Sequence, residues 1–126
     1  MNSQATKALA TVIVAGGLGL VASASATRVL EPIEGGYEAV LTEVVLPAST
    51  AGYVIVPPCS ACPPVSLGVS AQTAYLVERA PVPFADFMQA ANALLRSGRA
   101  ERAAVYVFYD LETTRVTRVV LDDLDL

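Results

Sequence analysis

The sequence contains no histidine, and this absence excludes several kinds of chemistry. A Ser-His-Asp or Cys-His catalytic arrangement needs an imidazole base, and covalent haem attachment needs a histidine directly after a Cys-x-x-Cys pair. A proline, Pro63, follows that pair here. No glycine-rich phosphate loop is present outside the first 26 residues. We therefore expect a protein that is not an enzyme, and we assign it no catalytic residue and no cofactor.

Lysine is almost absent, and the charge balance is acidic. Lys7 is the only lysine, so the residues after position 26 carry seven arginines against twelve Asp and Glu side chains, a net charge of −5. An acidic domain is repelled by phosphate backbones and by anionic lipid surfaces. We therefore expect no nucleic-acid partner.

The first 26 residues have the pattern of a cleavable signal peptide. Lys7 precedes an uncharged stretch whose apolar centre spans residues 9–22, and Ala24-Ser25-Ala26 supplies the small-x-small pattern of a cleavage site. The alternative is an uncleaved anchor, since residues 8–27 are just long enough to cross a bilayer. No cysteine lies near residue 26, which excludes a lipoprotein anchor. We expect a periplasmic or secreted protein with no stable membrane anchor after cleavage.

The remainder is the length of one domain, and we divide it at residue 52. Residues 27–51 are expected to form a partly extended N-terminal arm, in which residues 27–36 are loose and residues 37–46 fit either a strand or a short helix. Residues 52–126 are expected to form a β-rich domain, with residues 122–126 as an exposed acidic tail.

Five strands and one helix are expected in the β-rich domain. The strands fall at residues 53–56, 65–69, 73–77, 103–109 and 115–121. The helix falls at residues 84–97, where apolar residues recur every three or four positions between Pro83 and Gly98. The order β-β-β-α-β-β predicts an α+β, β-rich fold. It is either a small five-stranded OB-like barrel or an open sheet with one packed helix.

Cys59 and Cys62 form the one conspicuous motif, a Cys-x-x-Cys pair among prolines. A redox-active pair needs a helix N-terminus at the first thiol, whereas this pair lies between two expected strands. A zinc site usually needs four ligands, and the sequence has no histidine or second cysteine pair to complete one. Two thiolates alone could bind Cu(I). In an oxidising compartment the favoured reading is a structural disulfide, worth about 2 kcal/mol for so small a loop. We therefore expect no metal site.

A candidate ligand face lies on the last two expected strands. Tyr106 shares one face of its strand with Phe108, and Arg115 and Arg118 bracket the next strand. On an OB-type barrel, Tyr106, Arg115 and Arg118 would suit a sugar or a nucleic acid. The alternative is that one face of these strands is core and the other an ordinary solvated surface.

Residues 52–121 resemble a group of small exported bacterial proteins of uncharacterised function. The resemblance rests on the strand at residues 53–56 running into Cys59 and Cys62, on the helix that begins at Phe84, and on the ending at residues 107–110 and 115–121. In element order alone the chain also resembles periplasmic OB-fold proteins, which implies a binding role.

Three functions follow from these patterns. The first is an exported, non-enzymatic module that binds a protein or small ligand in the periplasm. The second is a thiol-disulfide or Cu(I)-handling protein that uses Cys59 and Cys62. The third is an oligosaccharide- or nucleic-acid-binding OB-type domain.

Overall fold

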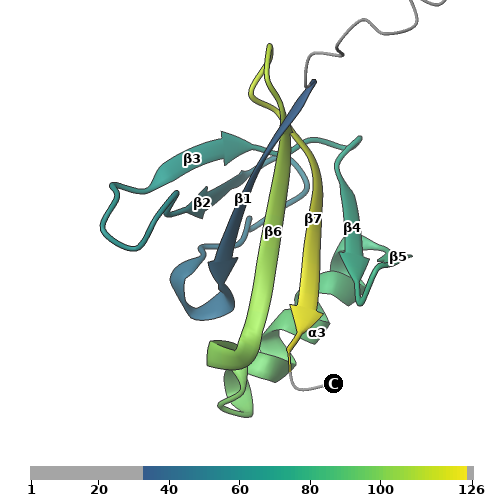
Figure 1. The fold of residues 1–126 in the computed structure, drawn as a ribbon. Helices are drawn as coiled ribbons and strands as arrows, with labels where there is room; N and C mark the ends of the chain where they lie inside the picture. Colours follow the sequence, from purple (N-terminus) through teal and green to yellow (C-terminus); the bar gives the residue numbers. More distant parts are fainter. Residues whose placement is uncertain (1–32, 125–126) are drawn as a thin grey trace, which may run out of the picture. The chain divides into compact units, whose positions relative to one another are not determined.

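The computed structural model of the chain describes residues 33–124 (Figure 1). The expected leader, residues 1–26, and the first six residues of the expected arm lie outside the described residues. The described part contains two sheets and one α-helix, so the α+β expectation is confirmed.

The larger sheet has five strands in the order β1-β6-β7-β4-β5. Its members are β1 (Glu34–Val40), β4 (Ala74–Val77), β5 (Ala80–Val82), β6 (Ala103–Asp110) and β7 (Val116–Asp123). Neighbouring strands are antiparallel except β4 and β7, which run parallel. The sheet ends in β1 on one side and β5 on the other, so the open-sheet alternative is confirmed and the OB-like barrel is wrong.

No barrel forms, because two of the expected strands pair with each other in a separate two-stranded sheet. β2 (Tyr53–Val56) and β3 (Val65–Gly68) pair with each other, and Val45 adds an isolated bridge to Ile55. Val54 and Val56 of β2 are fully buried. The hairpin therefore joins the molecule through apolar side chains in a shared core rather than through backbone hydrogen bonds to the larger sheet.

Part of the expected loose arm is a strand. β1 includes Gly35 and Gly36, whose segment we expected to be irregular, and it pairs along its length with β6. The rings of Tyr109 and Phe108 lie against these two glycines, one on each face of the sheet. Aromatic rings on a neighbouring strand compensate for the missing side chains of edge glycines. After β1 the chain makes a 3-10 turn, η3 (Leu41–Glu43), so the strand alternative for this region applies as far as Val40.

Two further details of the larger sheet differ from expectation. The three-residue strand β5 was missed, because Pro81 lies inside it and its length gives little alternation. Asp122 and Asp123 are not an exposed tail: β7 continues through them and pairs with Ala103 and Ala104 of β6.

The helix α3 (Phe84–Arg96) ends one residue before the expected boundary. Its apolar stripe places Phe87 and Ala91 in the core, where both are fully buried. Pro83 occupies the N-cap with an extended backbone. Gly98 has a φ of 77° just after the helix, the left-handed conformation that glycine adopts without a steric penalty.

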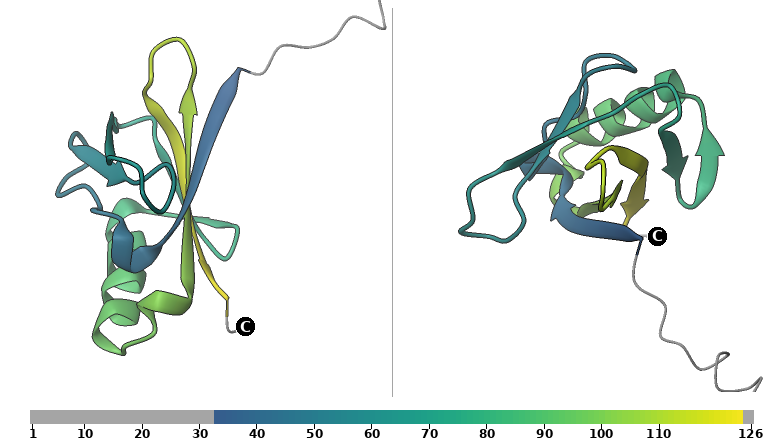
Figure 2. Two further views of the ribbon diagram at one scale, coloured as in Figure 1. Left: turned by 60° about the vertical axis from the view of Figure 1, so that its left-hand side comes forward. Right: turned by 90° about the horizontal axis from the view of Figure 1, so that it is seen from above.

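The core lies on one face of the larger sheet. Figure 2 shows α3 and the β2–β3 hairpin on the same side of β6 and β7. Inward-facing side chains of the two central strands are fully buried there, including Val105, Val107 and Val119. The ring of Tyr75 on β4 joins them and meets Phe87 of α3 at 5.1 Å between centroids. The opposite face carries Tyr106 and Arg118 and is not covered by any element of residues 33–124.

Candidate functional site: the cleft between α3 and β7

The cysteine pair forms a disulfide in the connection between β2 and β3. The Cys62 N–H donates to the Cys59 carbonyl at 3.1 Å, and the two Cα atoms are 5.0 Å apart, so the loop is a single tight turn. No helix begins at this turn, and the hollow beside Cys59 is also lined by the carboxylates Glu38 and Glu43. Negative charge beside a sulfur disfavours the reactive thiolate. The surroundings of the pair favour a structural disulfide.

The structure brings two of the three predicted face residues onto one surface. The Arg118 guanidinium lies over the Phe108 ring, 3.8 Å from its centroid, and bonds to the Glu34 carboxylate at 2.9 Å. The Thr117 hydroxyl also donates to Glu34, and these two hydrogen bonds lower the pKa of that carboxyl. Arg118 is therefore held by partners within the chain.

Tyr106 lies one alternation further along the same open face. Partial burial raises the pKa of its hydroxyl, and the nearby charges of Glu38 and Asp122 add to the effect. Arg115 does not belong to this face. It directly precedes β7 and lines a separate hollow with Tyr53 and Gly68.

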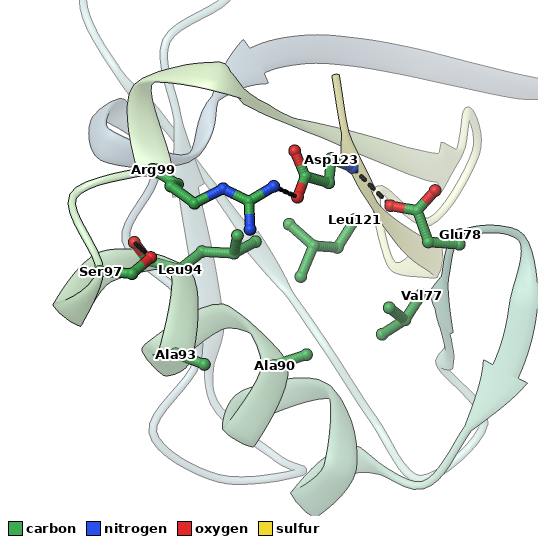
Figure 3. Close-up of a pocket in the computed structure, with 9 residues that line it drawn as sticks. All are labelled: Val77, Glu78, Ala90, Ala93, Leu94, Ser97, Arg99, Leu121 and Asp123. Atoms are coloured by element: carbon green, nitrogen blue, oxygen red, sulfur yellow. Dashed lines mark hydrogen bonds and ion pairs between the residues drawn. The ribbon is translucent and has the colours of Figure 1, made fainter. Parts of the chain in front are cut away.

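A cleft that the sequence did not reveal lies between α3 and the ends of β4 and β7 (Figure 3). Its volume is about 450 Å³. Because β4 and β7 run parallel, their C-terminal ends meet at the same edge of the sheet and face the last turns of the helix. The apolar lining residues are Val77, Ala90, Ala93, Leu94 and Leu121. The two alanines of α3 leave the space that larger side chains would fill.

Asp123 connects the two charged sides of the cleft rim. Its carboxylate forms an ion pair with Arg99, which follows α3, and its backbone N–H donates to the Glu78 carboxylate at 2.6 Å. Figure 3 shows Arg99, Asp123 and Glu78 in a row above the apolar floor. The Asp123 side chain is 13% exposed, so this pair is partly shielded from water.

Glu78 is held in an unfavourable backbone conformation. Glu78 and Arg79 form the two-residue turn between β4 and β5, with φ values of 52° and 70°. Such hairpin turns prefer Asn-Gly or Asp-Gly, because a positive φ is costly for other residues. Strained backbone of this kind persists where surrounding contacts hold it, and it is frequent at functional sites. Here the contact is the hydrogen bond that fixes the Glu78 carboxylate at the cleft.

The lining residues combine an apolar floor with a few polar groups. One of these, the Ser97 hydroxyl, donates to the Leu94 carbonyl at 3.1 Å. An apolar floor with a few convergent polar groups is the usual composition of a ligand pocket. In residues 33–124, no three Asp, Glu or Cys side chains are grouped as a metal site would require.

Sequence reasoning missed Glu78 and Asp123 for different reasons. Asp123 continues the alternation of Val119 and Leu121, so the β7 pattern could have placed it on the helix-covered face. The Glu78-Arg79 pair has none of the residue types that predict a tight hairpin.

Two further observations bear on the setting of this site. No helix of the described part is both long enough and apolar enough to span a bilayer. No family model, curated protein or solved structure matches the chain.

Proposed function

We propose that this chain is an exported, non-enzymatic binding module that holds a small amphipathic molecule in the cleft between α3 and β7. The observation that carries the proposal is the composition of that cleft. The cleft has a volume of about 450 Å³, and its apolar floor lies beneath a rim where Glu78, Arg99 and Asp123 converge. This volume suits a small organic molecule rather than a folded partner.

The rest of the chain supports a binding role. The absence of histidine removes the commonest catalytic base, and the disulfide at Cys59 and Cys62 supplies rigidity in an oxidising compartment. Export rests on the leader pattern of residues 1–26 and on the resemblance to small exported proteins.

Two experiments test the two parts of the proposal. Fractionation of a bacterial host followed by N-terminal sequencing should find the protein outside the cytoplasm, beginning at Thr27. Recovery of the full 126-residue chain from the cytosol would contradict export. Extraction of the purified protein and mass spectrometry of the extract should release an amphipathic small molecule.

A matched pair of variants ties any bound molecule to the cleft. Ala93→Leu places a large side chain in the cleft, whereas Ala85→Leu places the same side chain on an exposed position in the first turn of α3. We expect ligand to be absent from the first variant and retained by the second. Equal retention by both would contradict the proposed site.

A second candidate function is oligosaccharide binding on the open face of the sheet. It is supported by Tyr106, which lies on the uncovered face of the sheet, two residues from the Phe108 ring that the Arg118 guanidinium overlies. Aromatic side chains on an exposed sheet provide stacking surfaces. Loss of oligosaccharide binding in Tyr106→Ala but not in Tyr53→Ala would favour this function.

A further inference from the structure

We infer that the ligand of the α3–β7 cleft is a small organic cation, an ammonium group attached to an aliphatic or aromatic body. This inference rests on the proposed function and adds the chemical class of the ligand. It follows from the sign of the charge around the cleft and from the atoms that remain available on the rim.

The rim of the cleft carries an excess of negative charge. Among its described lining residues, Glu78 and Asp123 supply two carboxylates and Arg99 supplies one guanidinium. Because Arg99 pairs with Asp123, the Glu78 carboxylate is the excess charge within this set. The adjoining hollow adds one charge of each sign, Asp122 and Arg79, and leaves this excess unchanged.

The Glu78 carboxylate is held beside the cleft through one of its two oxygens. One carboxylate oxygen, Oε2, accepts the hydrogen bond from the Asp123 N–H at 2.6 Å. That bond fixes the carboxylate beside the cleft and leaves Oε1 as an acceptor. An ammonium group carries only hydrogen-bond donors, so it complements this oxygen, whereas a carboxylate ligand would be repelled by it.

The C-terminal end of α3 lies at the cleft. The cleft is lined by Ala93, Leu94 and Ser97, which belong to the last turn and C-cap of the helix. The C-terminal end of a helix carries a partial negative charge and favours cations. The helix end and the Glu78 carboxylate therefore favour the same sign of ligand.

The apolar floor of the cleft suits an organic cation better than a metal ion. Val77, Ala90, Leu94 and Leu121 offer no oxygen ligands from their side chains, whereas a metal ion needs several. An aliphatic or aromatic body removes this apolar surface from water. The cleft thus accommodates a hydrocarbon body against its floor and a hydrogen-bond donor group at its rim.

Three probes of equal chain length separate the charge from the apolar body: hexylamine, hexan-1-ol and hexanoate. Each is titrated into the ¹⁵N-labelled full-length protein while the amide signals of Leu94, Leu121 and Asp123 are followed. We expect hexylamine to bind at least about fivefold more tightly than hexan-1-ol, and hexanoate most weakly. Added salt should weaken hexylamine binding and leave hexan-1-ol binding unchanged, because screening acts only on charge.

Glu78→Gln tests the assignment of the ammonium partner. The amide oxygen of glutamine still accepts from the Asp123 N–H, so the turn is retained while the charge is removed. We expect hexylamine to bind this variant no more tightly than hexan-1-ol does. Glu112→Gln, an exposed change in the loop between β6 and β7, should leave the preference intact.

The outcomes distinguish this inference from the proposed function. If all three probes shift the cleft signals with equal affinity, the cleft binds small molecules but the cationic class is wrong. If hexylamine is preferred equally by the protein and by Glu78→Gln, the inference is also wrong. If no probe shifts the cleft signals, and extraction of the purified protein releases no amphipathic molecule, the proposed function itself fails.

Discussion

The ring of Tyr109 lies directly against the backbone of Gly35 in the neighbouring strand. A β-carbon at residue 35 would come within 2.6 Å of the Cζ atom of that ring. Tyr109 cannot move away freely, because it is stacked on Tyr37 with 5.2 Å between the ring centroids and 16° between the ring planes. The edge strand β1 is therefore attached to β6 by a contact that only glycine allows.

This contact predicts that Gly35→Ala destabilises the protein by about 1–3 kcal/mol, the usual cost of forcing extra volume into a packed site. Gly52→Ala is the matched control, since a β-carbon there meets its nearest atoms at an ordinary 3.6 Å. Chemical denaturation of both variants measures the difference. Equal stability of the two would show that the Tyr109 ring relaxes without loss.

Glu34 predicts a component of stability that is lost in acid. Hydrogen bonds from Thr117 and then from Arg118 hold the pKa of the Glu34 carboxyl below its ordinary value in the folded chain. A lowered folded pKa stabilises the protein above the unfolded pKa, and the contribution disappears as the pH falls through the folded value. Unfolding free energies at pH 7 and pH 3 should therefore differ less in Glu34→Gln than in the unmodified protein. The exposed Glu101→Gln should keep the original difference.

Replacing arginine by glycine should change the unfolding free energy in opposite directions at the Glu78-Arg79 turn and in α3. Arg79→Gly relieves a φ of 70° and should raise the unfolding free energy by about 0.5–1 kcal/mol. Arg96→Gly places glycine in the last position of α3 and should lower it by up to about 1 kcal/mol. Thermal denaturation compares the two variants. A destabilised Arg79→Gly would mean that the arginine side chain contributes more than the strain costs.

We expect that the Tyr75 hydroxyl can be removed without lowering the unfolding free energy. Tyr75 is 4% exposed, its hydroxyl has no hydrogen-bond partner within residues 33–124, and burial raises its pKa. Tyr75→Phe should therefore be neutral or stabilising by about 1 kcal/mol, because a buried unsatisfied group is removed. Thr73→Val gives the contrast: the Thr73 hydroxyl donates to the Val116 carbonyl at 2.8 Å, and its loss should cost about 1–3 kcal/mol. A clear destabilisation by Tyr75→Phe would reveal a partner for the hydroxyl.

The disulfide predicts a modest, redox-dependent stabilisation. Reduction of Cys59 and Cys62 should lower the unfolding free energy by about 2 kcal/mol, since the closed loop is short. The Cys59→Ser/Cys62→Ser variant should show the stability of the reduced protein and no response to reductant. Binding of one Cu(I) by the reduced protein, or fast thiol-disulfide exchange, would instead favour the thiol-active function.

The sequence by itself located the helix and the cysteine turn, whereas it missed β5 and the start of β1. Periodic apolar residues and the flanking Pro83 and Gly98 located α3 to within one residue, because helix period and helix ends depend on neighbours along the chain. The cysteine turn was located for a similar reason: two cysteines three residues apart between expected strands lie within one turn, where their sulfur atoms can meet.

Only the tertiary structure decided which strands pair and where the site lies. Whether β2 and β3 close a barrel or form their own sheet depends on contacts between distant residues, and local patterns do not encode them. Gly35 and Gly36 predict a loose segment until Tyr109 and Phe108 lie against them. Likewise, the charged rim of the cleft forms because β7 places Asp123 between Glu78 and Arg99. These three residues are far apart in the chain.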